Sequence, residues 1–173
     1  MKSSTDAFFR EVLDDRTSVA SQLEEIHGLA WEVMDSALLD LCRLRVAMLL
    51  DCDSELEVSN SDLDSEKIAS LSVWSSSSLF SESEKACLRF TEEFIIDVSS
   101  IPDSSAFAVR ECLGEEGFVN FVNALLVVEQ RIRLQIVWRK IREEVSVCPD
   151  HKGLHLHISI ISFVRLFRYG KKR

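Results

Sequence analysis

The stretch DLCRLRVAMLLDCDSELEVS, residues 40–59, decides the fold of this chain. Its first half continues an apolar pattern with steps of three and four residues, made by Trp31, Met34, Leu38, Leu41, Leu44 and Met48. Such spacing places apolar side chains on one face of a helix. Its second half sets Cys52 among four carboxylates, Asp51, Asp53, Glu55 and Glu57. The stretch therefore predicts a packed helix, over about 31–50, followed by a thiol in acidic surroundings.

Working outward, the segments after this stretch predict more helices. A short helix is expected over residues 62–71, where the run from Asp62 to Glu66 offers an Asp or a Ser as N-cap. Ser81 and Glu84 have the spacing of a capping box, in which each side chain bonds to the backbone of the other residue. A helix is therefore expected to begin there and to run to about residue 98.

Glycines mark the other expected helix boundaries. Gly114 should end a helix over residues 106–113, and the longest helix should follow over about 115–144. In the first part of the chain, Gly28 is interpreted as a turn. Five Gly and two Pro in 173 residues leave few turn formers for an all-β protein. An all-α fold is the prediction.

Charge divides the chain into two regions. All 29 acidic residues precede residue 151, whereas residues 151–173 carry six Lys or Arg. We predict a helical domain over residues 1–145 and a basic, apolar tail over 146–173, for which strand and helix remain alternatives. An acidic domain repels phosphates, so nucleic acid is not an expected partner. Contact of the tail with a membrane is not expected either, because a solvated basic end is the simpler interpretation.

The compartment is predicted from three absences in the sequence. The first residues show no apolar core of a secretory signal, and the longest apolar run, residues 118–128, is too short to span a bilayer. The five cysteines form no C-x-x-C pair, which is typical of reduced thiols. A cytoplasmic protein is expected.

Metal and cofactor sites are not expected. Three histidines lie close together near the end of the chain, His151, His155 and His157. No single helix or strand aligns all three on one face, and no thiol or carboxylate stands at a fixed spacing from them. The prediction is therefore no metal and no cofactor.

Four segments together resemble the carboxymuconolactone decarboxylase and alkyl hydroperoxidase D (AhpD)-like superfamily. They are ALLDLCRLRVAMLLDC at 37–52, DLDSEKIASL at 62–71, FSESEKACLRFTEEFIIDV at 80–98 and FVNALLVVEQRIRLQIVW at 121–138. The resemblance covers about residues 30–142. It implies an AhpD-like helical fold whose helices interlock in a homo-oligomer, either a dimer, a trimer or a hexamer.

The resemblance also implies a site. The peroxidase branch of this superfamily places a Glu twelve residues before a C-x-x-C-x-x-x-H motif. In this chain Asp40 falls on the Glu, Cys52 on the first Cys, Glu55 on the second Cys and Ser59 on the His. On a helix, Cys52, Glu55 and Ser59 would share one face. Only Cys52 is unchanged, so the chain is a divergent member that lacks the motif.

These replacements bear directly on the chemistry. A thiolate attacks peroxide, and a nearby thiol normally resolves the sulfenic acid that forms. Glu55 cannot resolve it, and the surrounding carboxylates disfavour a thiolate at Cys52. The decarboxylase branch relies on a His near its pocket, yet no His occurs between His27 and His151. Decarboxylation is therefore less expected than peroxidase chemistry.

Two functions follow as alternatives. The first is a catalytically degenerate member of the superfamily with a binding or assembly role and a remnant pocket near Asp40, Cys52 and Arg131. The second is a thiol-dependent alkyl hydroperoxidase that uses Cys52 and a resolving thiol from elsewhere, such as Cys148 or a partner subunit. The first is preferred, so the chain is expected not to be an enzyme.

Asp40 allows two interpretations. It is either a general acid or base, or a carboxylate that pairs with Arg43, with Arg45 or with the pair Arg131 and Arg133. Pairing is preferred because a buried charge normally has a partner.

Polar residues on the longest expected helix form a second candidate site. Asn120, Asn123 and Arg131 lie near whole helical turns from one another. They either line a pocket for a small-molecule ligand, or a subunit interface, or make hydrogen bonds between helices.

Overall fold

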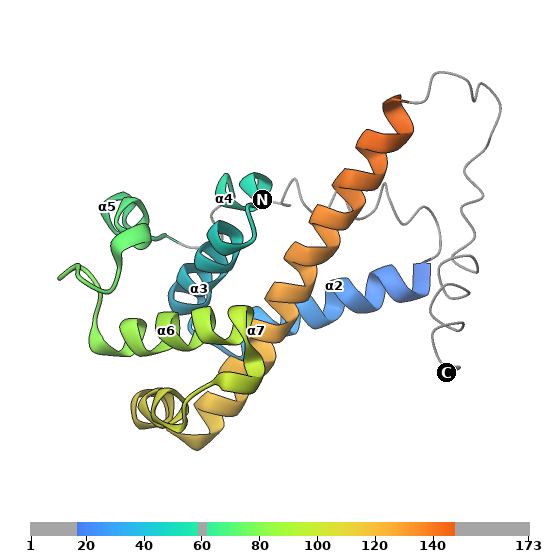
Figure 1. Cartoon of the computed structure of the whole chain (residues 1–173). Helices are drawn as coiled ribbons and strands as arrows, with labels where there is room; N and C mark the ends of the chain where they lie inside the picture. Colours follow the sequence, from blue (N-terminus) through green and yellow to red (C-terminus); the bar gives the residue numbers. More distant parts are fainter. Residues whose placement is uncertain (1–16, 59–61, 148–173) are drawn as a thin grey trace, which may run out of the picture. The chain divides into compact units, whose positions relative to one another are not determined.

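The computed structural model describes residues 17–58 and 62–147, and these residues form helices joined by short connections (Figure 1). The helices are α2 (Thr17–Glu32), α3 (Ser36–Leu49), α4 (Asp53–Leu56), α5 (Ser65–Ala69), η1 (Leu71–Val73), α6 (Glu82–Ile96), η2 (Val98–Ser100) and α7 (Asp103–Val147), where η marks 3-10 helices. Within the described ranges there is no strand. The all-α prediction is confirmed.

The chain divides into two compact units, residues 1–139 and 140–173. Of the second unit, the described residues are the end of α7. Ser59, Cys148 and the three histidines of residues 151–157 lie outside the described residues.

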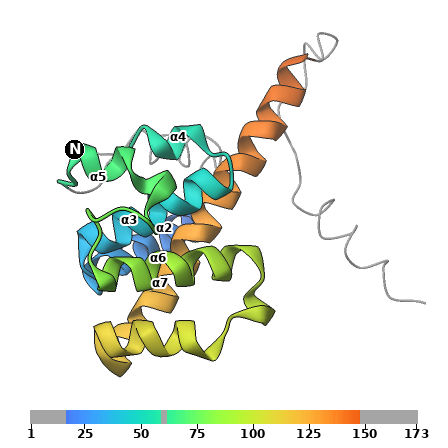
Figure 2. The same cartoon turned by 60° about the vertical axis from the view of Figure 1, so that its left-hand side comes forward.

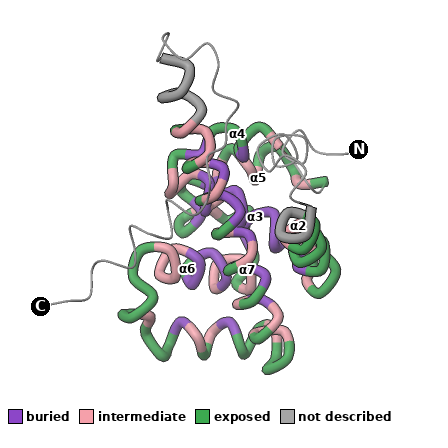
Figure 3. The backbone as a smooth tube through the Cα atoms, turned by 90° about the vertical axis from the view of Figure 1, so that its right-hand side faces the viewer, coloured by how far each residue is buried: buried purple, intermediate pink, exposed green. Residues whose placement is uncertain are grey.

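Helix α3 is the most deeply buried element. Its N-cap is Asp35, whose side chain accepts a hydrogen bond of 2.8 Å from the backbone N–H of Leu38. Nine of its fourteen residues are buried, including the charged side chains of Asp40 and Arg43. Figure 3 shows this concentration of buried residues along α3. A helix surrounded on several sides can place polar groups in the core only if they have partners there.

Helix α6 packs against α3 and also contacts α7 (Figure 2). The capping box of Ser81 and Glu84 is formed as the sequence predicts. Phe90 of α6 makes edge and tilted ring contacts with Phe118 and Phe121 of α7, with centroid distances of 5.7 and 5.8 Å. Aromatic pairs of this geometry add to the free energy of burial.

Helix α7 changes direction at Gly114, where φ is 74° and ψ is 174°. The short arm before Gly114 and the long arm after it are the two helices that the sequence predicts, and Figure 2 shows the turn between them. Only glycine adopts this backbone conformation without strain. The long arm carries most of the buried residues of α7, whereas Ser105 and Val109 are buried on the short arm.

The turn predicted at Gly28 is wrong. Gly28 lies inside α2, and nothing approaches the position of a Cβ there within 4 Å. The helix continues because Ala30 packs into the core and because the indole N–H of Trp31 donates to Nε2 of His27, 3.2 Å away. Tertiary packing thus overrides a weak local preference.

None of the helices within residues 17–58 and 62–147 is long and apolar enough to cross a bilayer.

Candidate functional site

The candidate site begins where α3 ends and the chain reverses into α4. Asp51 has a left-handed conformation with φ of 52°, which Asp tolerates better than most residues. The backbone N–H of Cys52 donates a hydrogen bond of 2.9 Å to the carbonyl oxygen of Ala47. Cys52 is then the N-cap of the four-residue helix α4. The regular helical face expected for positions 52, 55 and 59 is therefore not formed at Cys52.

Asp40 is paired with Arg43 on the same helix. The two residues are one helical turn apart, and Nε of Arg43 donates to Oδ1 of Asp40 at 2.8 Å. Both side chains are almost fully inaccessible to solvent. Of the arginines considered as partners of Asp40, Arg43 thus makes an ion pair with it.

The same guanidinium reaches across to the segment after Cys52. Nη1 of Arg43 donates to Oε2 of Glu55 at 2.7 Å and to the Glu55 carbonyl oxygen at 2.6 Å. Nη2 donates to the carbonyl oxygen of Val58. The planar fork of arginine suits such multiple contacts, which lysine cannot reproduce. Arg43 thereby fixes the α4 segment to α3.

Gln135 of α7 completes the cluster. Its Nε2 donates to Oε1 of Glu55 at 2.6 Å, and its Oε1 accepts from Sγ of Cys52 at 3.9 Å. Sγ of Cys52 also lies 3.5 Å from Oγ of Ser54. Hydrogen bonds therefore run without a break from the Cys52 thiol through Gln135, Glu55 and Arg43 to Asp40. We call these five residues, Asp40, Arg43, Cys52, Glu55 and Gln135, the buried polar cluster.

The charges of the buried polar cluster bear on what Cys52 can do. One guanidinium faces two carboxylates, so the cluster already holds one more negative than positive charge when all three groups are ionised. A thiolate would add a second uncompensated anion in a desolvated place, which is unfavourable. Cys52 is 1% exposed and donates to an amide oxygen. The geometry accommodates a protonated thiol.

The other cysteines of the described ranges are free thiols. Burial, the largest influence, raises the pKa of Cys42 to about 12 despite a hydrogen bond with Thr91, and it also raises the pKa of Cys87. These two thiols belong to the core between α3 and α6, whereas Cys112 is exposed. Reactive cysteines need access and a favourable charge environment, so Cys42 and Cys87 are structural.

The polar residues predicted on α7 do not form one site. Arg131 is buried and pairs with Glu24 of α2 at 3.1 Å. Asn123 is exposed and donates to the carbonyl oxygen of Val119 in its own helix, at 2.9 Å. Asn120 is half-buried. The interhelical partner expected for this group is therefore found at Arg131.

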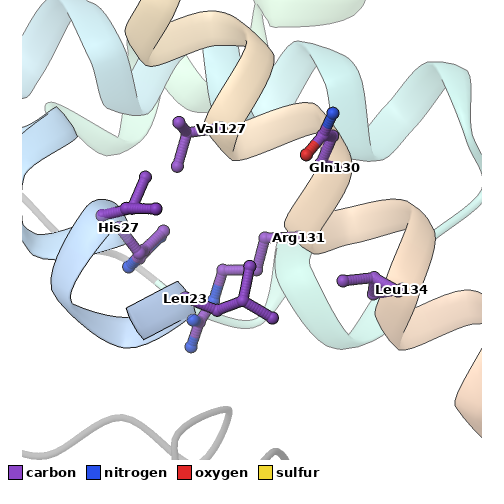
Figure 4. A pocket seen from close by; sticks show the side chains of 7 residues that line it. Leu23, His27, Val127, Gln130, Arg131 and Leu134 are labelled. Atoms are coloured by element: carbon purple, nitrogen blue, oxygen red, sulfur yellow. The ribbon is translucent and has the colours of Figure 1, made fainter. Parts of the chain in front are cut away.

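Arg131 lines a pocket of about 80 Å³ between α2 and α7. Figure 4 shows side chains of the two helices facing one another across it. Its lining consists of Leu23, Ile26, His27, Val127, Gln130, Arg131 and Leu134. Neither Asp40 nor Cys52 lines it. This pocket is therefore not the remnant pocket that was expected near Asp40, Cys52 and Arg131.

Sequence reasoning missed Gln135 as a member of the site. The signal was its register, because Gln135 lies seven residues after Val128 and fourteen after Phe121, both of which are buried. A polar side chain in an otherwise apolar stripe indicates a buried hydrogen-bonding partner. Which partner it meets, 80 residues away along the chain, is not encoded in that register.

No group of three or more His, Cys, Asp or Glu in residues 17–58 and 62–147 is arranged to hold a metal ion.

Comparison with known proteins gives one informative likeness. No protein-family profile matches the sequence, and no curated protein matches it significantly. A crystal structure of a protein of unknown function from Agrobacterium tumefaciens, described as a candidate antioxidant defence protein AhpD, superimposes with a TM-score of 0.66 and 18% sequence identity. The match covers 73% of this chain and 92% of that one. The chain has the AhpD-like helical fold.

Proposed function

We propose that this chain is a catalytically degenerate member of the AhpD-like superfamily that acts through binding and assembly rather than through thiol chemistry. One observation carries the proposal. Glu55, at the position of the second thiol of the family motif, is held by Arg43 and Gln135 at 2.7 and 2.6 Å. A carboxylate so engaged is part of the protein's internal structure.

Peroxidase chemistry at Cys52 would face three obstacles. Peroxide must reach the sulfur, but the residue is 1% exposed. The sulfur must be a thiolate, but Cys52 belongs to the buried polar cluster, which has one carboxylate more than it has cations, and its thiol donates to Gln135. The sulfenic acid must be resolved, but the position three residues on is Glu55. Each obstacle alone would slow turnover.

The buried polar cluster has a clear structural role instead. It ties α3, through Arg43, to the α4 segment, through Glu55, and the same carboxylate to α7, through Gln135. Two consecutive helices, α3 and α4, are thereby joined to α7, whose Gln135 lies 80 residues after Glu55, by charge-assisted hydrogen bonds. We propose that the residues at the site positions of the family here stabilise the packing of α3, α4 and α7.

A small-molecule role is less favoured than assembly. The pocket beside Arg131 is the proposed place for a small ligand, but its volume of about 80 Å³ is well below the roughly 300 Å³ at which ligand clefts begin. The proposed role is therefore assembly into a homo-oligomer through the surface of the protein.

The test is a peroxide consumption assay with dihydrolipoamide as the dithiol reductant. Hydrogen peroxide and cumene hydroperoxide would be supplied to the wild type, to Cys52→Ser and to Cys112→Ser. We expect all three proteins to match the rate without protein. Turnover that is lost in Cys52→Ser and kept in Cys112→Ser would overturn the proposal in favour of a peroxidase that uses another resolving thiol.

A further inference from the structure

Helix α2 presents an apolar strip that the described residues leave about half exposed. Ile26, Leu29 and Val33 are 46%, 50% and 47% exposed. The backbone N–H of Val33 donates to the carbonyl oxygen of Leu29 at 3.1 Å, so the helical path continues through Val33. Spacings of three and four residues then place the three side chains on one side of the helix, and Figure 3 shows the exposed residues of α2. Such a strip is typical of a helix that packs against a partner.

The strip borders the pocket between α2 and α7. Ile26 belongs to both, and Figure 4 shows Val127 and Leu134 of α7 across the pocket from α2. An apolar cavity of about 150 Å³ takes up benzene, and this pocket of about 80 Å³ is smaller. It therefore fits a single aliphatic side chain rather than a whole ligand. When a helix binds in a groove, anchor side chains fill pockets of this kind.

The arginines of α7 beside the pocket are already matched by carboxylates. Arg131 pairs with Glu24 at 3.1 Å, and Arg133 pairs with Glu129 at 2.7 Å. The side chain of Glu129 is 13% exposed, so its charge stays close to that of Arg133. Neither arginine therefore gives this surface a net positive charge.

The remaining charges beside the strip are negative. Helix α2 contains no Lys or Arg. Glu25 and Glu32 are exposed, and their separation of seven residues places both on one flank of the apolar strip. On α7, Glu115 and Glu116 are exposed at the start of the long arm. An apolar strip with an acidic flank is complementary to an apolar stripe with a basic flank.

We infer that this surface binds an amphipathic helix of another protein, one whose apolar stripe is flanked by Lys or Arg. The stripe covers Ile26, Leu29 and Val33 and inserts one aliphatic side chain into the pocket, while the basic flank meets Glu25 and Glu32. The strip and the pocket together are called the α2 groove.

A second copy of the chain fits the α2 groove less well. Packing α2 on α2 would oppose the carboxylates of the two helices. The face of α7 offers Arg133, whose charge is matched by Glu129. The inference therefore goes beyond the assembly of copies proposed above, because its partner is a different chain.

The test is fluorescence anisotropy of labelled model peptides titrated with the full chain. The probe is a helical peptide of about 18 residues, with Leu at steps of three and four residues and Lys at the other positions. One control peptide replaces every Lys by Glu. A second control keeps the composition but scrambles the order, so that no apolar stripe forms. We expect the Leu and Lys helix to bind at least about tenfold more tightly than either control.

A variant in the apolar strip locates the site. Leu29→Gln removes the centre of the strip, and we expect it to raise the dissociation constant of the Leu and Lys helix about tenfold. The matched control is Val73→Gln, since Val73 is 57% exposed on η1 and lies outside the lining of the pocket. It should bind the peptide like the wild type.

A charge variant separates the acidic flank from the net charge of the chain. Glu25→Gln with Glu32→Gln should also raise the dissociation constant about tenfold. The matched control is Glu66→Gln with Glu111→Gln, which removes the same charge from exposed positions on α5 and on the short arm of α7. It should bind the peptide like the wild type.

Circular dichroism verifies the fold of every variant, and if Leu29→Gln is unfolded the charge variants decide. No binding of the Leu and Lys helix, equal binding of either control peptide, or equal losses in the control variants would overturn the inference. Peptide binding that is lost as the chain self-associates would assign the α2 groove to a second copy and would overturn it as well. Peroxide turnover by the wild type would overturn only the proposed function.

Discussion

At the residue scale, Arg43 gives Asp40 and Glu55 a structural role, as buried partners of its guanidinium. Neither carboxylate is accessible enough to act on a substrate, and both are ion-paired to the same guanidinium. Arg43 also donates to the backbone carbonyl oxygens of Glu55 and Val58. A carboxylate buried at position 55 is tolerated because the guanidinium at position 43 compensates it.

Removal of Arg43 should therefore be severely destabilising. In Arg43→Met the two carboxylates stay buried without a positive partner, and we expect the free energy of unfolding to fall by about 3–5 kcal/mol. Arg43→Lys should recover only part of this loss, because an ammonium cannot span both carboxylates and the carbonyl oxygens. Urea denaturation followed by circular dichroism measures each value.

The matched control removes a half-buried cation whose partner carboxylate lies in solvent. Lys85 lies 3.6 Å from Glu82, whose side chain is almost fully in solvent. Lys85→Met should change the free energy of unfolding by less than about 1 kcal/mol. A loss in Arg43→Met no larger than in this control would show that the buried polar cluster contributes little to stability.

At the element scale, the sequence predicted a helix end correctly where a single residue determines it, either by capping a backbone group or by adopting a special backbone conformation. The capping box at Ser81 and the break at Gly114 are both local devices, and both are found as predicted. The turn at Gly28 was wrong because glycine permits a turn without requiring one. The helix predicted over about 31–50 is wrong at its start, because α2 ends at Glu32 and Asp35 caps a new helix, α3, at Ser36, a break that no glycine marks.

Gly114 and Gly28 make opposite predictions for the same substitution. Gly114→Ala forces a Cβ into a conformation open essentially to glycine alone, and should lower the free energy of unfolding by about 1–3 kcal/mol. Gly28→Ala adds a better helix former in open space within α2, and should raise it by up to about 1 kcal/mol. Thermal and urea denaturation of the two variants side by side would check both signs. Equal losses in the two would contradict the helical assignment of Gly28.

At the scale of the whole molecule, the order of the four family-like segments was enough to predict the AhpD-like helical fold. The candidate site could be predicted only in part. Asp40 and Arg43 lie one turn apart on a helix, so their pairing follows from local geometry. The contacts of Glu55 with Arg43 and Gln135 join residues 12 and 80 positions apart, and depend on how the helices pack.

The core makes a prediction about thiol labelling of the whole chain. Cys42, Cys52 and Cys87 are buried, and burial raises the pKa of Cys42 to about 12. We expect these thiols to react with iodoacetamide at neutral pH only when the protein unfolds, whereas Cys112 reacts in the folded state. Mass spectrometry of peptides labelled with and without urea would measure this. Rapid native labelling of Cys52 would contradict its burial and would favour the peroxidase alternative.

The continuous hydrogen-bond network from Cys52 to Asp40 also constrains the evolution of this sequence. A thiol introduced at position 55 would leave Arg43 with one carboxylate fewer and Gln135 without its acceptor, so that step begins with a loss of stability. A two-thiol arrangement at positions 52 and 55 would need coupled replacements at positions 43 and 135, because both side chains bond to Glu55. The cluster therefore makes these positions epistatic, so that each can change without loss of stability only together with the others.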